Sequence, residues 1–226
     1  MSIPRVAFVS VMCACLFAPS FAPAASKAAM EESMSADGLQ KTKLRGVDVV
    51  YTRPGASLAS YSKVRIAPVA VSFRKDFAPV KPGSRTKYAP DELEKIRASV
   101  GRIVHEEFAR ELARGSYTAT DAAGPEVLDV RASIVDLYVN APDTMDAGRT
   151  RTYTMDAGEM TLVMELADSE TGQVLARVYD RREARDTGMM TWTNSVTNQA
   201  EAANVARSWA KILRKRLDAA RAGEAE

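Results

Sequence analysis

Alternating apolar and polar residues predict strands in the first third of the chain. Residues 47–51 form a short β-favouring stretch, which the turn sequence Arg53-Pro54-Gly55 closes. Residues 62–73 are interpreted as one further strand. Pro68 within this strand implies an edge position or a bulge, because proline has no N–H to donate to a neighbouring strand.

A long strand is predicted at residues 126–139. Its apolar side chains occupy even positions from Leu128 to Ile134 and odd positions from Val135 to Val139. Because side chains alternate along a strand with a period of two, this change of phase predicts a β-bulge.

A hairpin is predicted next, with strands at residues 160–166 and 174–180. The connecting residues, 168–172, end in Gly172, which suits the positive φ angle of a tight turn.

Apolar residues recurring at three- and four-residue steps predict two amphipathic helices. The first begins at Pro90, whose fixed φ suits a first turn, and ends at Gly115. The second covers about residues 196–220, with Trp209 on its buried side. The order of strands, helix, strands and helix predicts an α+β fold, a mainly antiparallel sheet with both helices packed on one face.

The N-terminus has the three parts of a secretory signal: Arg5, an apolar run from Val6 to Phe17, and the small residues of Ala22-Pro23-Ala24. The run is too short to cross a bilayer, which takes about 20 apolar residues. We therefore expect residues 1–24 to be a signal peptide and the mature protein to be periplasmic.

Both cysteines, Cys13 and Cys15, lie inside this apolar run, so cleavage before Ala25 leaves no thiol for disulfides, catalysis or metal binding. An outer-membrane lipoprotein is the alternative, since Cys15 follows the small residue Ala14 as a lipidated cysteine does. The other neighbours of Cys15 fit a lipidation site poorly, so secretion is the preferred interpretation.

The rest of the chain is expected to form one folded unit. Residues 25–44 have no apolar period and predict a flexible arm. Residues 45–222 are expected to fold as a single α+β domain, and residues 223–226 to form a disordered tail.

Charge and motifs exclude several classes of function. The 31 basic and 29 acidic residues are balanced, so we expect no nucleic-acid partner, and contact with a membrane only through a lipid anchor. The single histidine, His105, lies between core-facing Val104 and polar Glu106, which indicates a boundary residue rather than a catalytic base. Walker, dinucleotide and Gly-x-Ser-x-Gly motifs are absent from the sequence. A Ser-Lys pair or a carboxylate pair stays open because acidic residues are plentiful, but nothing in the spacing selects one pair. We therefore expect no catalytic residue, no cofactor and no metal.

Two polar segments carry the candidate contact residues. One is the loop with Met189, Met190 and Trp192, side chains that can anchor an interface. The other lies between two copies of Thr-Met-Asp-Ala-Gly, at residues 144–148 and 154–158. Its exposed side chains are Arg149, Arg151 and Tyr153.

The same segments hold four methionines, which offer an alternative interpretation. Soft thioether sulfur suits copper(I), so Met145, Met155, Met189 and Met190 could serve a metal carrier. The histidine and cysteine ligands that usually support such a site are missing.

The segments Tyr51 to Ala56, Tyr61 to Val64 and Asp168 to Ala176 resemble the bacterial domain-of-unknown-function family 3313, a family of envelope lipoproteins. The resemblance covers about residues 38–217. It implies an envelope protein but no established activity, so it assigns no residue a role. Members usually show a clear lipidation cysteine, and this chain departs from that pattern around Cys15.

Together these patterns predict a non-catalytic cell-envelope protein, a partner-binding or structural module that contacts an envelope protein or its own copy. A periplasmic carboxylate-dependent hydrolase and a small-ligand or metal carrier are the alternatives. A concave pocket with two close carboxylates, one with a raised pKa, would favour the hydrolase. A largely apolar cavity would favour the carrier.

We expect the native protein to begin at Ala25, because small residues precede it at the positions that a leader peptidase reads. Intact-mass measurement of protein purified from the cell envelope checks this. A mass that starts at Cys15 with added acyl chains would show the lipoprotein alternative instead.

Overall fold

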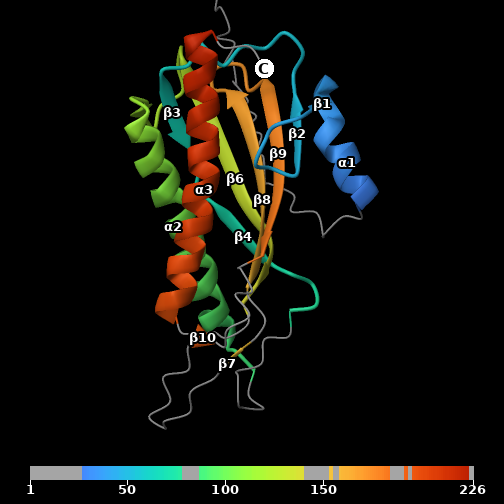
Figure 1. Ribbon diagram of the computed structural model, residues 1–226, viewed down its shortest axis with the longest axis vertical. Coiled ribbons are helices and arrows are strands. Elements are labelled where there is room, and N and C mark those ends of the chain that lie inside the picture. The colour runs from blue at the N-terminus through green and yellow to red at the C-terminus, as the bar shows by residue number, and fades with distance from the viewer. Residues whose placement is uncertain are drawn as a thin grey trace, which may run out of the picture.

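The computed structural model describes residues 27–77, 87–139, 153–154, 158–183, 191–192 and 195–223 (Figure 1). Its helices are α1 (Lys27–Ser35), the 3₁₀ turn η1 (Ala36–Gly38), α2 (Pro90–Arg114) and α3 (Ser195–Ala222). Its strands are β1 (Gln40–Thr42), β2 (Val49–Thr52), β3 (Lys63–Ile66), β4 (Ala70–Phe73), β5 (Thr118–Ala119), β6 (Val127–Tyr138), β7 (Tyr153–Thr154), β8 (Glu159–Asp168), β9 (Val174–Glu183) and β10 (Thr191–Trp192). The predicted signal peptide and Cys15 lie outside the described residues.

An eight-stranded, mainly antiparallel sheet confirms the predicted α+β class. Its strands follow the order β1-β2-β9-β8-β6-β3-β5, and β4 also pairs with β6. The pairs β1–β2, β2–β9, β9–β8 and β8–β6 are antiparallel. Strands β3 and β4 run parallel to β6, and β5 runs parallel to β3. Helices α2 and α3 lie side by side in front of the sheet, as predicted (Figure 1).

The predicted hairpin is formed by β8 and β9, and Asp168 holds its turn. The Oδ1 atom of Asp168 accepts hydrogen bonds from the backbone N–H and the hydroxyl of Thr171, each at 2.8 Å. Gly172 has a φ of +70°, the left-handed conformation that glycine adopts without strain.

Strand β6 contains the predicted bulge. Its register with β8 shifts between Val135 and Tyr138, and Asp136 has a φ of 53°. One extra residue in a strand turns the following side chains to the opposite face. Ile134 and Leu137 are therefore both buried although three positions separate them.

The prediction of one strand over residues 62–73 is wrong, because residues 67–69 separate β3 from β4. The backbone N–H of Ala67 still bonds to the carbonyl of Val130 at 3.0 Å. Pro68 then interrupts the ladder, since it has no N–H to donate. Strand β4, which follows the break, lies at an edge, because β6 is the one described strand that pairs with it.

Helix α2 has the predicted bounds, beginning at Pro90 and capped by Gly115. Phe108 and its apolar neighbours one turn away on either side face the core. Gly101 lets the helix approach the sheet closely, because a Cβ atom there would lie only 2.7 Å from the carbonyl oxygen of Val69. The position of α2 over β3 and β4 thus depends on glycine, which has no side chain, at position 101.

The N-terminal segment differs from the flexible arm predicted for residues 25–44, because α1, η1 and β1 are structured. Met34 and Leu39 are buried against Tyr51 on the sheet face opposite α2 and α3. Arg177 also donates hydrogen bonds to the carbonyls of Ser33 and Ala36. Two buried apolar side chains are too few to show a period in the sequence, which is why this third helix was missed.

A buried carboxylate joins α3 to the sheet. Asp180, on β9, is 1% exposed. Its Oδ2 accepts hydrogen bonds from the indole N–H of Trp209 and from Nε of Arg182, each at 2.6 Å, and its Oδ1 accepts one from the backbone N–H of Asp48 at 2.8 Å. A buried charge is stable only when such donors surround it.

Replacing Trp209→Phe should therefore lower the free energy of unfolding by about 1–3 kcal/mol, because the buried carboxylate loses a donor. Urea unfolding of this variant, of Asp180→Asn and of the double variant measures the coupling. We expect the double variant to lose less stability than the sum of the two single losses. Losses that add within about 0.5 kcal/mol would contradict a direct interaction.

Candidate functional site

The structure brings the two predicted contact segments together. Strands β7 and β10 pair antiparallel, with Trp192 opposite Tyr153 and Thr191 opposite Thr154. Four other predicted contact residues lie outside the described residues: Met189, Met190, Arg149 and Arg151. The proposed copper ligands Met145 and Met155 lie outside them as well.

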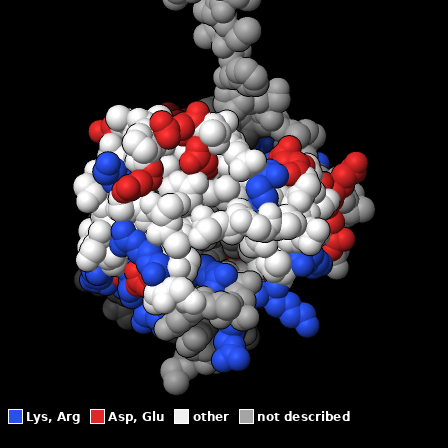
Figure 2. Space-filling model, turned by 90° about the horizontal axis from the view of Figure 1, so that it is seen from above, with Lys and Arg blue, Asp and Glu red and all other residues white. Residues whose placement is uncertain are grey.

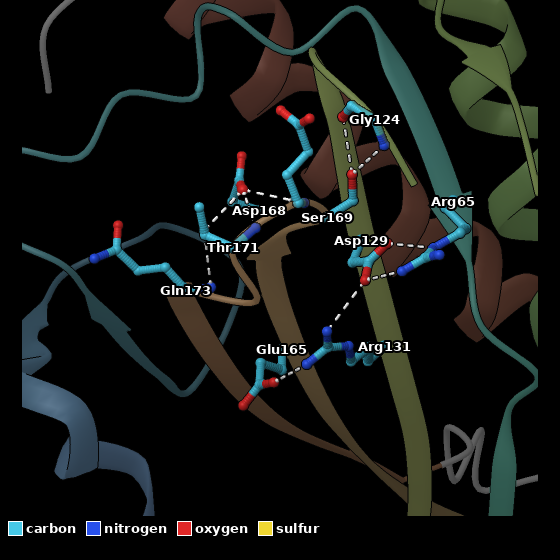
Figure 3. Close-up of polar contacts among 10 residues, drawn as sticks. Arg65, Gly124, Asp129, Arg131, Glu165, Asp168, Ser169, Thr171 and Gln173 are labelled. Carbon is cyan, nitrogen blue, oxygen red and sulfur yellow. Dashed lines mark hydrogen bonds and ion pairs between the residues drawn. The ribbon is translucent and has the colours of Figure 1, made fainter. Parts of the chain in front are cut away.

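A row of ion pairs crosses the sheet on the face opposite α2 and α3 (Figure 3). Asp129 on β6 lies between Arg65, which holds it with two hydrogen bonds of 2.6 Å, and Arg131 at 3.1 Å. Arg131 reaches on to Glu165 on β8, at 2.9 Å, and Arg177 on β9 binds the same carboxylate at 3.0 Å. Opposite charges on neighbouring strands stabilise a solvent-facing sheet surface.

The hollow beside this row does not have the properties of a reaction site. It has a volume of about 320 Å³ and is lined by Arg65, Asp121, Asp129 and Arg131 among others. Burial alone would raise the pKa of Asp129, but hydrogen bonds from Arg65 and Arg131 lower it. A carboxylate held ionised by two arginines is a poor general base or acid.

Two further buried carboxylates join the helices. Glu107 of α2 binds Arg207 of α3 at 3.1 Å and also Arg110, and one turn later Glu111 binds Arg214 at 3.0 Å. Burial would raise the pKa of Glu107, but hydrogen bonds from Arg207 and Arg110 lower it. The same balance, with Arg214 and Arg114 as donors, lowers the pKa of Glu111.

The fourth carboxylate with a shifted pKa is Asp168 in the hairpin turn, where the backbone and hydroxyl of Thr171 lower it. Tyr61 donates its hydroxyl to Asp168 at 3.0 Å, and burial together with this bond raises the pKa of Tyr61 to about 12. All four shifts favour the charged carboxylate. The raised pKa that would favour a hydrolase is therefore not found among the shifted carboxylates of the described residues.

Three further observations concern the described residues. His105 is partly buried on α2, as expected for a boundary residue. In the described ranges, no group of three or more His, Cys, Asp or Glu side chains is placed to hold a metal ion. Within the same ranges, no helix is both long enough and apolar enough to cross a membrane.

The candidate site is an apolar pocket between the sheet and the C-terminal half of α3, with a volume of about 460 Å³. Its floor is formed by apolar side chains of β2, β8 and β9, including Val50, Leu162, Met164 and Val178. Trp209 and other side chains of α3 form one wall. The remaining lining comes from Thr42, Leu44, Val47, residues 52–58 and Gly223.

The pocket follows from the widths of the two layers. Seven strands side by side span roughly 29 Å, whereas two packed helices cover roughly 20 Å. Helix α2 lies close to β3, β4 and β5, and α3 packs on α2. The side of the sheet near β2 is therefore covered by loops instead of a third helix, and the space beside α3 stays open.

The charged side chains that line the pocket are Arg53 and Arg216, and no lining residue that the structure describes is acidic. Arg53 follows β2 and its Nε donates to the carbonyl of Val174 at 2.7 Å. Figure 2 looks onto the end of the molecule where α3 ends. Uncharged residues cover much of that end, with acidic side chains mostly on one side and basic ones mostly on the other.

Sequence reasoning did not identify this pocket. Arg53 belongs to the turn sequence predicted after residues 47–51, and no pattern in the second predicted helix marks Arg216. The pocket joins residues from β2, β8, β9 and α3, so a pattern within any one element could not have signalled it.

Sheet, helix pair and pocket define an α+β domain with an apolar pocket beside α3. The chain belongs to DUF3313, a family of proteins of unknown function, whose model matches residues 30–213. The resemblance inferred from the turn and strand segments is thus confirmed. Among curated proteins, none matches this chain.

The chain is also similar to several solved structures. One is the PelC dodecamer from Paraburkholderia phytofirmans, with 14% identity, 70% of this chain and 94% of that chain covered, and a TM-score of 0.36. Protein XCC0632 from Xanthomonas campestris has 13% identity, coverage of 76% and 89%, and a TM-score of 0.37. A candidate lipoprotein from Caulobacter crescentus has 14% identity, coverage of 71% and 93%, and a TM-score of 0.31. Similarity at this level assigns no activity.

The ion pairs between α2 and α3 predict that the free energy of unfolding decreases as the pH is lowered. Because the folded pKa of Glu107 and Glu111 is lowered, their contribution is present above the unfolded value of about 4.3 and is lost as the pH falls through the folded value. Glu107→Gln should lower the free energy of unfolding at pH 7 by about 1–2 kcal/mol, a moderate loss because Arg207 and Arg110 are half exposed.

Urea unfolding between pH 7 and pH 3 tests this expectation. The stability of Glu107→Gln should depend less on pH below about 5 than that of the unchanged protein. Glu106→Gln is the matched control, because Glu106 is exposed on the same helix and pairs with Arg102 alone. Equal pH profiles for Glu107→Gln and the unchanged protein would show that Glu107 does not contribute to the pH dependence of stability.

Proposed function

We propose that this protein is a non-catalytic binding module of the bacterial cell envelope, and that it holds a small apolar ligand in the pocket beside α3. The observation that carries the proposal is the pocket itself. Ligand sites are concave and lined mainly by apolar side chains, as this pocket is. A lined space of about 460 Å³ lies within the range of ligand sites.

The lining explains why a ligand would bind. Leu162 and Met164 are 1% and 4% exposed, so the floor of the pocket belongs to the hydrophobic core. Apolar surface in contact with water is unfavourable by about 25 cal/mol per Å². Above this floor, the lining side chains of Leu44, Val47, Leu58 and Ile212 are only partly buried, so a ligand that displaces water from them gains that free energy.

Two further observations support the remaining parts of the proposal. The N-terminal secretory pattern and membership of DUF3313 support an envelope location. The lowered pKa values of Glu107, Glu111, Asp129 and Asp168 support a structural role for these carboxylates rather than a catalytic one.

Binding to a protein partner is a second candidate function. The ladder of β7 and β10 places Tyr153 opposite Trp192, so two segments distant in sequence adjoin each other. Aromatic residues are enriched at the centres of interfaces. Crosslinking in the native envelope would identify such a partner through peptides that contain either strand.

The uncharged fluorophore N-phenyl-1-naphthylamine should bind the purified protein with increased and blue-shifted emission. Ala220→Trp places a large side chain at the lining of the pocket and should weaken this binding roughly tenfold. Fluorescence titration measures both affinities.

Ala219→Trp is the matched control, because Ala219 is adjacent on α3 but is not a lining residue. Its affinity for the fluorophore should equal that of the unchanged protein. Absence of binding to the unchanged protein, or equal weakening by both substitutions, would show that the pocket is not a binding site.

A further inference from the structure

We infer that the ligand is a single-chain amphiphile with an anionic head group, a carboxylate or a phosphate. This inference rests on the proposed function and adds the chemistry of the ligand. It follows from three properties of the pocket: the sign of its charges, the position of those charges relative to the apolar floor, and its volume.

The charge of the lining is of one sign. Arg53 and Arg216 line the pocket, and its described lining includes no aspartate or glutamate. Arginine presents a planar fork of N–H donors that matches the two oxygens of a carboxylate or phosphate. Arg53 would repel a cationic head group here.

The guanidinium group of Arg53 is held in position and can donate hydrogen bonds to a ligand. Its Nε donates to the carbonyl oxygen of Val174 at 2.7 Å, which fixes the guanidinium relative to β9. No described carboxylate forms an ion pair with Arg53. This contrasts with Arg65, Arg131 and Arg177, which are each held by acidic residues on the sheet. The guanidinium of Arg53 keeps donors for a ligand.

The partial negative charge at the C-terminus of α3 opposes the binding of an anion. Ala220 and Gly223 line the pocket, and the carbonyl groups at a helix C-terminus carry about half a negative charge. The full positive charge of Arg53 outweighs this partial charge. The local potential therefore favours an anion at the edge of the pocket.

Polar and apolar groups are separated within the pocket. Leu162, Met164 and Leu166 form part of the floor and are nearly fully buried, whereas Arg53 is only partly buried. Residues Thr52 and Ser57 lie near Arg53 in the chain and add hydroxyl groups to the lining. An amphiphile would place its chain on the floor and its head group beside Arg53.

The volume limits the length of the chain. A methylene group occupies about as much space as a water molecule, about 30 Å³ in the liquid, so 460 Å³ holds on the order of fifteen such groups. One acyl chain of medium length fits the pocket, whereas a lipid with two long chains does not.

Displacement of N-phenyl-1-naphthylamine by four compounds with the same alkyl length tests the inference. The compounds are dodecanoate, dodecyl phosphate, dodecanol and dodecyltrimethylammonium, each below its micelle concentration. At least one of the two anions should displace the fluorophore at a concentration about tenfold lower than dodecanol. The cation should be the weakest competitor. Preference for one anion over the other identifies the head group.

Substitutions of Arg53 then locate the charge that is recognised. Arg53→Gln should reduce the preference for the anion over dodecanol by about tenfold, whereas Arg53→Lys should retain most of it because the charge remains. Arg102→Gln, at an exposed position on α2, is the control and should leave the preference unchanged. Melting temperatures of the variants verify that each is folded.

The two proposals fail in different ways. If the fluorophore does not bind at all, the pocket is not a ligand site. If it binds and all four compounds compete equally in the unchanged protein, the ligand site stands and the anionic head group is wrong. An anion preference that survives Arg53→Gln would also overturn the role assigned to Arg53.

Discussion

The carboxylate of Asp180 is the constraint on which the arrangement of the other elements depends. An ionised group without water must be surrounded by donors, and this one draws them from Trp209 of α3, Arg182 of β9 and the backbone of Asp48. These three lie in different parts of the chain. Their common acceptor fixes the height of α3 above the sheet and holds the loop before β2 against it.

The pocket lies directly beside this cluster and shares Trp209 with it. Because α3 is held to β9 through a polar contact and to α2 through Glu107 and Glu111, it does not need to close onto the strands along its whole length. The helix pair then covers one part of a wide sheet and leaves the side near β2 to loops. An apolar cavity is a direct result of that geometry.

Elements that carry a repeating pattern were predictable from the sequence. The bulge of β6, the β8–β9 turn and the bounds of α2 each follow from local periodicity or turn chemistry. The break at Pro68 was recognised as an irregularity but not as a division into two strands, because β3 and β4 both find their partner in distant β6. The pocket and the ion pairs of Glu107 and Glu111 depend on contacts between separate elements, which periodicity does not encode.

The attachment of α1 to the outer face of the sheet has a mechanical consequence. It depends on the small cluster of Met34, Leu39 and Tyr51, on hydrogen bonds from Arg177, and on the short edge strand β1. Edge elements with few buried contacts open at the lowest free energy. Tension entering from the N-terminal side would peel α1 and β1 away from β2 before it loaded the core between the sheet and the helix pair.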